Sequence, residues 1–303
     1  MDKLGRNYYL EIEVPGSQSL ILPHQLPGGA SPATFTIEFD ITRNTLTSAN
    51  VCQIRIFNLS KNNRNKIRKD DMDQSDLRTV LLRAGYGNSL STIFSGTISR
   101  ASSVREGVNF ITTIESFDGG FAFVNDHTSL TFLKGASQET MLKTLGSSLT
   151  NVSLGAVGKF PGSLSRGAAV SGNTTQLLAE MSGGAFFIDN GKVHILGNDE
   201  VIEGPIPTIN AAAGLLGTPV IENLQVTFDM IFEPRLLVGQ KILLESSTAD
   251  QGRQGVQGFN GTYKVISVKH RGMISPAVCG DAITTVGLSQ WVGALTIVPQ
   301  ATQ

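Results

Sequence analysis

The chain has 303 residues, of which 40% are hydrophobic and only 16% are charged, and its formal net charge is −1. This apolar content is sufficient for folded cores and excludes a wholly disordered chain. The near-zero net charge excludes the general attraction to nucleic acid or acidic lipid that basic proteins have, although a local basic patch remains compatible with it. The length predicts about two domains, with one large β domain or three small ones as alternatives.

The first third of the chain is typical of β-strands joined by turns. Residues 34–42 alternate apolar and polar side chains, as in a strand with one buried face. Residues 23–32 are rich in Pro and Gly and are expected to form an exposed loop, and Ser60 is expected to cap a short helix over residues 61–69. Because an antiparallel sheet must protect its edge strands, we expect it to close into a barrel. Further strands are expected at residues 8–14, 52–56, 79–84, 92–99 and 108–117.

The middle of the chain has helices as well as strands. Ser137 is expected to cap a helix with one apolar stripe, and a second helix over residues 174–181 is expected to end at the glycine pair that follows it. Asn190-Gly191 can adopt the positive φ angles of a tight hairpin turn. Short strands are expected at residues 130–133, 152–154, 185–188 and 193–196.

The last third is again β in character, after an expected loop over residues 205–219. Residues 252–258 are expected to form a polar hairpin tip, and the tail after residue 290 is expected to be either frayed or docked on a partner. A Phe-x-Gly-Thr pattern occurs at residues 94–97 and again at 259–262, which we interpret as the trace of a duplicated barrel. Strands are expected at residues 224–228, 230–232, 242–244, 262–269 and 282–288.

These elements predict a mainly β fold. We expect two antiparallel β-barrel-like domains with a small α/β domain between them. The expected boundaries are residues 1–128 for the first barrel, 129–203 for the α/β domain and 204–303 for the second barrel.

Cysteine usage and hydropathy bear on the compartment of the protein. Cys52 and Cys279 lie far apart in apolar contexts without a Cys-x-x-Cys motif, so we expect two buried free thiols, while a disulfide between them stays open. The polar start of the chain predicts no signal peptide. The longest weakly polar stretch, residues 209–221, is too short and too broken by Gly and Pro to span a bilayer, so no membrane insertion is expected.

Motifs for metal, phosphate and nucleophilic chemistry are absent from the sequence. The histidines lack the spacing of metal ligands and are expected at the surface or at strand edges. Neither a Gly-x-Ser-x-Gly motif nor a glycine-rich loop followed by Lys and Ser or Thr occurs. We therefore predict no catalytic residue, no cofactor-binding residue, no metal ligand and no cofactor. The four histidines are His24, His127, His194 and His270.

Three carboxylates are candidates for a hydrolytic pair, since a glycosidase needs only two. Glu115 and Asp118 lie near the end of a predicted strand, and Asp189 lies in a hairpin tip. Solvated acids are common in turns, and we favour that interpretation for all three. Asp126 and His127 could belong to a triad, but neighbouring residues on a strand point to opposite faces.

The only run of like charges lies in the predicted helix over residues 61–69. One interpretation is contact with nucleic acid or an acidic partner; the other is a solvated helix face that the following acids neutralise. No aromatic residue is interleaved, which disfavours a platform for single-stranded nucleic acid. We favour the solvated face, which a partner protein could also contact. The cations are Lys61, Arg64, Lys66, Arg68 and Lys69, and the acids are Asp70, Asp71 and Asp73.

An ordered series of segments carries a family resemblance, although no single motif in it is diagnostic. The segments are residues 54–60, 80–86, 93–96, 112–119, 232–240 and 261–272. This series resembles the baseplate hub proteins of bacteriophage tails, a group that includes the contractile-tail hubs of Mu-like phages. The resemblance covers about residues 37–288.

The resemblance implies a structural hub without enzymatic activity. Three copies would form a ring in which six barrels surround a DNA channel, linking a sixfold tail tube to a threefold central spike. The implied partners are further copies of the chain, the tail tube or tube-initiator protein, the spike protein, the tape measure protein and other baseplate proteins. DNA would only pass through the channel, whose wall we expect to be poor in Lys and Arg. The implied location is the tail baseplate of the virion, assembled in the host cytoplasm.

Two alternatives remain open from the sequence. The first is a cell-wall peptidoglycan hydrolase with its site in the α/β domain, and the second is a glycan-binding module of the tail. The sequence leaves open the host, the faces that meet tube and spike, and whether the tail contracts, although the resemblance favours a contractile tail.

Overall fold

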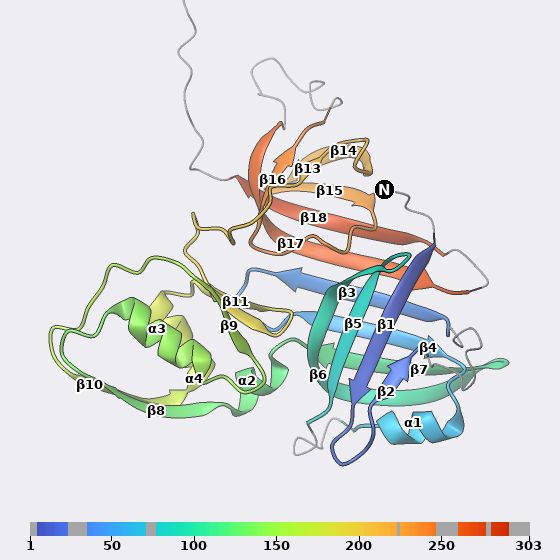
Figure 1. Ribbon diagram of the computed structural model, residues 1–303, viewed down its shortest axis with the longest axis horizontal. Coiled ribbons are helices and arrows are strands. Elements are labelled where there is room, and N and C mark those ends of the chain that lie inside the picture. Colours follow the sequence, from blue (N-terminus) through green and yellow to red (C-terminus); the bar gives the residue numbers. More distant parts are fainter. Residues whose placement is uncertain are drawn as a thin grey trace, which may run out of the picture.

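One continuous sheet dominates the molecule (Figure 1). The structure is a computed structural model that describes residues 5–23, 35–70, 77–222, 225–246, 260–276 and 280–290. The strands of the large sheet are β1 (Arg6–Glu13), β2 (Leu20–Leu22), β3 (Ile37–Asn44), β4 (Val51–Phe57), β5 (Thr79–Tyr86), β6 (Ser89–Glu106), β7 (Asn109–Phe117), β13 (Thr208–Ile209), β14 (Leu215–Glu222), β15 (Gln225–Ile231), β16 (Lys241–Leu244), β17 (Gly261–Ile274) and β18 (Ala282–Gln290). Their order is β14-β15-β18-β17-β3-β4-β7-β6-β5-β1-β2, and β16 joins β13 to β17.

Strands β1–β7 form the N-terminal β region, which curls around its own core. In β3 the burial alternates along the strand, with Ile37, Phe39 and Ile41 inside, as the two-residue period predicts. The curl brings β1 and β5 across from β3 and β4 (Figure 1), and side chains from these four strands share one hydrophobic cluster. The Tyr8 hydroxyl donates to the Phe35 carbonyl oxygen at 2.8 Å and so bridges the two sides of the curl. The region is barrel-like but its described strands do not close into a ring.

Strands β13–β18 form the C-terminal β region and have a second core. Alternate residues of β15, namely Val226, Phe228 and Met230, pack there against residues of β17 and β18. The order β16-β17-β18 repeats the order β5-β6-β7, because in both regions three consecutive strands are antiparallel neighbours.

Direct strand pairing joins the two β regions. β3 and β17 pair antiparallel from Ile37–Ile274 to Asn44–Ser267, so the sheet passes from one region into the other without interruption. Phe232, which follows β15, packs in the core of the N-terminal region with its ring 5.7 Å from that of Phe39. The mainly β fold class is confirmed, and the structure adds that the two β regions share one sheet.

The α/β region lies to one side of the large sheet (Figure 1). Helices α3 and α4 pack together and share a third core with the sheet β11-β12-β9, while β8 and β10 form a two-stranded ribbon. Ser137 and Asn173 cap the two helices, and Asn190 and Gly191 have φ angles of 53° and 71° in the hairpin turn. The elements are α2 (Gly120–Asn125), β8 (His127–Phe132), α3 (Gln138–Ser147), β9 (Ser153–Val157), β10 (Ala168–Asn173), α4 (Thr174–Ser182), β11 (Phe186–Asp189) and β12 (Lys192–Ile195).

Most predicted elements are confirmed, and a few were missed. The helix after Ser60 is α1 (Lys61–Ile67), and the Ser60 hydroxyl oxygen accepts a hydrogen bond from the Asn63 backbone N–H at 3.3 Å. The predicted loop over residues 205–219 is wrong, because it contains β13 and most of β14. The predictions at residues 252–258, at Cys279 and after residue 290 lie outside the described residues, as does nearly all of the loop at 23–32. None of the helices within the described ranges has the length and apolar character needed to cross a bilayer.

Candidate functional site

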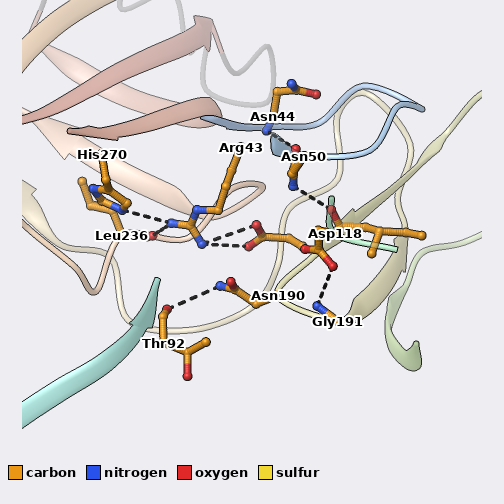
Figure 2. Close-up of polar contacts among 11 residues, drawn as sticks. Arg43, Asn44, Asn50, Thr92, Asp118, Asn190, Gly191, Leu236 and His270 are labelled. Atoms are coloured by element: carbon orange, nitrogen blue, oxygen red, sulfur yellow. Dashed lines mark hydrogen bonds and ion pairs between the residues drawn. The ribbon is translucent and has the colours of Figure 1, made fainter. Parts of the chain in front are cut away.

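A buried cluster of polar side chains lies where the two β regions and the α/β region meet (Figure 2). We call it the polar junction. It comprises Arg43 of β3, Asn50 before β4, Asp118 after β7, the hairpin residues Asp189, Asn190 and Gly191, and His270 of β17.

Arg43 is the centre of the polar junction and contacts all three regions. Its side chain is fully buried. Nη1 lies 3.2 Å from Oδ2 of Asp189 in the α/β hairpin, while Nη2 donates to the Leu236 carbonyl oxygen at 2.7 Å in the C-terminal β region. These groups bind a single guanidinium because its donors point in fixed, divergent directions.

His270 completes the surroundings of Arg43. Its Nε2 lies 3.4 Å from Nη2 of Arg43, and its Nδ1 lies 2.9 Å from the Thr284 hydroxyl. Burial, together with the positive charge of Arg43, holds the pKa of His270 well below its usual value. The imidazole is therefore neutral: Nε2 faces the donor of Arg43 and Nδ1 carries the proton.

Asp118 shares the junction with Asp189. Its Oδ1 accepts a hydrogen bond from the Gly191 N–H at 2.9 Å, whereas Oδ2 is buried without a partner among the described residues. Burial, reinforced by the charge of Asp189, raises the pKa of Asp118 to about 8. Burial also raises the pKa of Asp189, against the opposing effect of Arg43. One guanidinium thus faces two carboxyl groups, and the cluster is close to electrically neutral when Asp118 keeps its proton.

Hydrogen bonds of the Asn50 side chain and the conformation of Gly119 hold the tip of the β11–β12 hairpin in this junction. Asn50 Nδ2 donates to the Ile188 carbonyl oxygen at 2.7 Å, and Asn50 Oδ1 accepts from the Asn44 N–H at 2.9 Å. Gly119 has a φ of 67°, and a Cβ atom there would lie 2.6 Å from Cδ1 of Ile188. A side chain at this position would push the Ile188 side chain aside, and the positive φ itself favours glycine.

The burial of the junction overturns the predicted solvation of these acids. Asp118 and Asp189 were expected as solvated turn acids, but both are buried because the hairpin tip inserts between the β regions. Glu115 lies in β7, opposite Gln53 of β4, and none of its described contacts is with a residue of the junction. A catalytic carboxyl must contact its substrate, and a fully buried pair leaves no space for a glycan.

The histidine expectation is also partly wrong. His270 is fully buried, and His194 is nearly so, with its ring stacked 5.1 Å from that of Phe187. Burial, aided by Lys192, lowers the pKa of His194 to about 4, and its Nδ1 accepts a hydrogen bond from the Ala156 N–H at 3.1 Å. His127 is exposed, as expected, and His24 lies outside the described residues.

Among the described residues, the structure adds no candidate residue for metal binding or for thiol chemistry. Within the ranges that the structure describes, no group of three or more His, Cys, Asp or Glu residues is placed to hold a metal ion. Cys52 is a buried free cysteine, as predicted for this residue, and burial raises the pKa of its thiol.

A second candidate surface is the face of the large sheet that runs across both β regions, on the side opposite the cores. We call it the shared sheet face. Lys269 pairs with Asp40 at 3.3 Å across the β17–β3 boundary, and Arg55 pairs with Glu38 at 2.7 Å. Its charged residues are Glu38, Asp40, Arg55, Arg100, Glu106, Glu115, Asp229, Lys269 and Arg271. Sequence periodicity predicts which face of each strand carries charges, but it does not predict that the two regions form one surface.

Comparisons of the structure with solved structures identify tail proteins. A tail protein from Neisseria meningitidis MC58 aligns with a TM-score of 0.56 and 12% identity, over 93% of this chain and 96% of that chain. The 43 kDa tail protein of prophage MuSo2 from Shewanella oneidensis aligns with a TM-score of 0.56 and 7% identity, over 94% and 97%. At such identities the similarity establishes the fold alone.

A third solved structure comes from a secretion system. The Escherichia coli c3393 protein, a component of the type VI secretion system described as similar to the T4 bacteriophage tail proteins gp27 and gp5, aligns with a TM-score of 0.55 and 8% identity. The alignment covers 93% of this chain and 77% of that chain.

Sequence comparison identifies the family directly. Curated protein sequences give no match. The profile of the baseplate hub gp41 family, in contrast, matches residues 25–269, which is most of the chain. The resemblance inferred from the ordered segments is thereby confirmed, and the chain belongs to the baseplate hub gp41 family of phage tail proteins.

Proposed function

We propose that this protein is a non-enzymatic, trimeric hub that links the tail tube to the central spike around the DNA channel. The observation that carries the proposal is the β3–β17 pairing, which fuses two β regions into one rigid sheet. Three copies of such a chain would present six β regions around an axis. That number suits a sixfold tube on one side, while the threefold symmetry of the ring suits a spike on the other.

The shared sheet face is the proposed channel wall. Two of its four cations pair with acids on neighbouring strands, Lys269 with Asp40 and Arg55 with Glu38, and the face carries at least as many acids as cations. Paired cations offer DNA few free charges, so the polymer would pass without strong binding. The expectation of a wall poor in Lys and Arg becomes, for this face, an expectation of a wall with few unpaired cations. A ring of unpaired lysines on the wall of an assembled particle would contradict it.

The organisation of the chain is proposed to follow its three cores. We propose a first barrel-like domain over residues 1–128, an α/β domain over 129–203 and a second barrel-like domain over 204–303. The repeated order β5-β6-β7 and β16-β17-β18 supports a duplicated origin of the two β domains, although Gly96 faces Val80 whereas Gly261 faces Leu244, so the strand registers differ.

The proposed partners are further copies of the chain, the tube or tube-initiator protein, the spike, the tape measure protein and other baseplate proteins. The similarity to a protein described as related to gp27 and gp5 supports a spike-type partner. We propose that assembly occurs in the host cytoplasm and that the protein remains in the virion baseplate.

The mass of the purified full-length protein tests the trimer. Light scattering should give three times 32.3 kDa, about 97 kDa, and a larger particle when the spike or tube protein of the same tail is added. A monomer at high concentration that binds neither protein would refute the hub proposal.

A peptidoglycan-release assay separates the hub from the hydrolase alternative. We expect no release by the wild-type protein, since Asp118 and Asp189 lie in the buried junction and Glu115 lies apart from them. Release that disappears in Asp189→Asn or Glu115→Gln would restore the hydrolase. Retention on purified cell-wall sacculi would instead favour the glycan-binding module.

A further inference from the structure

A groove with a basic lining lies between α1 and the β6–β7 hairpin. These elements lie at the edge of the molecule opposite the α/β region (Figure 1). The groove has a volume of about 590 Å³. We call it the basic groove. It is lined by Lys61, Arg64 and Asn65 of α1, by Arg68 directly after this helix, by Ser102 and Ser103 of β6, and by Phe110 of β7. Three of these residues are cations and none is an acid, so the lining attracts negative charge.

An aromatic ring holds the central cation of the basic groove in place. Cζ of Arg64 lies 3.8 Å from the centroid of the Phe110 ring, at stacking distance. Arg64 Nε is buried and has no hydrogen-bond partner among the described residues. A stacked guanidinium loses little freedom when it binds a carboxylate, because its plane is already fixed.

The cations of the basic groove lack acidic partners in the part of the chain that the structure describes. Lys61, Arg64 and Arg68 form no ion pair there, whereas Arg55 pairs with Glu38 on the neighbouring sheet face. The sequence predicts that the acids following the helix neutralise these cations. Asp70 forms no such pair, and the other two acids lie outside the described residues.

An apolar rim adjoins the basic groove. Val108 at the hairpin tip is 88% exposed, and Phe110, which lines the groove, is 37% exposed. Exposed apolar side chains beside unpaired cations are typical of a protein interface rather than of a nucleic-acid surface. Arg64 also stacks on the Phe110 ring and so competes with a base for that ring.

We propose that the basic groove docks an acidic segment of a second protein, with carboxylates on Arg64 and Arg68 and an apolar side chain on Val108. Charge complementarity selects the acidic class of ligand, and the apolar rim selects a polypeptide over a nucleic acid. This docking does not require the trimer or the channel, so it stands apart from the hub proposal.

Fluorescence polarisation with the full-length protein tests the docking. The probe is a fluorescein-labelled peptide with the sequence Glu-Asp-Leu-Glu-Asp-Phe-Glu-Asp, and a peptide with Lys at every acidic position is its control. We expect saturable, salt-sensitive binding of the acidic peptide only. Arg64→Glu/Arg68→Glu should weaken it at least about tenfold, while Lys134→Glu, a reversal at an exposed loop position, should leave it unchanged.

A second variant and further binding and mass measurements also test the docking proposal. Phe110→Leu retains every charge but removes the ring under Arg64, and we expect it to weaken peptide binding several-fold with an unchanged melting temperature. No binding of the acidic peptide at millimolar concentration would overturn the proposal. So would tighter binding of a labelled DNA 12-mer, or a change in the protein's own oligomeric mass in Arg64→Glu/Arg68→Glu without any peptide binding, which would assign the groove to a second copy.

Discussion

Asp118→Asn is the most direct test of the polar junction. The structure holds this carboxyl fully buried beside Asp189, with Oδ2 unpartnered and with a pKa raised to about 8. Asparagine resembles the protonated acid in shape, and its Oδ1 can accept the same hydrogen bond from Gly191. The substitution therefore removes the titration while it keeps the contact.

The sign and size of the effect follow from linkage. An acid with a pKa of about 8 in the folded state and 3.8 as a free side chain binds more protons when folded, so stability falls as the pH rises between these values. The lowered pKa values of His194 and His270 act in the opposite direction, but only below their unfolded value of 6.5. Between pH 6.5 and 8 the Asp118 titration alone should cost the wild-type protein about 2 kcal/mol, and the raised pKa of Asp189 acts in the same direction.

Thermal unfolding at pH 6.5, 7.25 and 8 measures this difference. We expect the wild-type melting temperature to fall by about 4 °C over the series relative to that of Asp118→Asn. Glu203→Gln, at an exposed acid, serves as the matched control and should follow the wild type. Parallel curves for the wild type and Asp118→Asn would show that Asp118 is ionised in the fold and would refute the account of a neutral carboxyl.

Three other substitutions test how the regions are held together. Arg43→Met should destabilise the protein by about 3–5 kcal/mol in urea unfolding, because it leaves Asp189 buried without its cation, and Arg43→Met/Asp189→Leu should regain more than half of the loss. A single variant as stable as the wild type would contradict this. Gly119→Ala should lower the melting temperature through about 1–3 kcal/mol of strain at a φ of 67° against Ile188, and an unchanged melting curve would argue against the close approach. Tyr86→Phe removes a 2.9 Å hydrogen bond to a carbonyl oxygen of the C-terminal β region and should cost about 1 kcal/mol in urea, with no loss expected if water replaces the bond.

Local patterns predicted the elements that rely on local chemistry. The alternation over β3, the serine caps of α1 and α3 and the Asn190-Gly191 turn were all predicted from neighbouring residues. The missed elements lack such patterns. β14 contains Gly217 and Pro219 with a bulge between Leu216 and Val220, and β10 consists of small and polar residues.

Sequence patterns did not predict the polar junction, for a different reason. Arg43 and Asp189 are 146 residues apart, and Arg43 and His270 are 227 apart. Each of these residues is ordinary in its own segment, and Asp189 belongs to a turn sequence that usually faces solvent. Only the pairing of β3 with β17 and the insertion of the hairpin place them together, so no local period could have predicted their burial.

The residues of the polar junction are suited to fixing the orientation of the two β regions and the α/β region relative to one another. The β3–β17 pairing fixes the two β regions relative to each other. A purely apolar contact between that sheet and the β11–β12 hairpin would still allow small sliding movements of the hairpin. Arg43 removes this freedom, because its Nη donors are satisfied only when Asp189 and the Leu236 carbonyl oxygen occupy single positions. A buried network of this kind can cost stability compared with an apolar core of equal volume, and we infer that here it is retained for specificity. In Arg43→Met/Asp189→Leu the chain would then keep its fold while the α/β region gains freedom, which faster proteolysis or hydrogen exchange at the β11–β12 hairpin would reveal, and unchanged protection there would refute the inference.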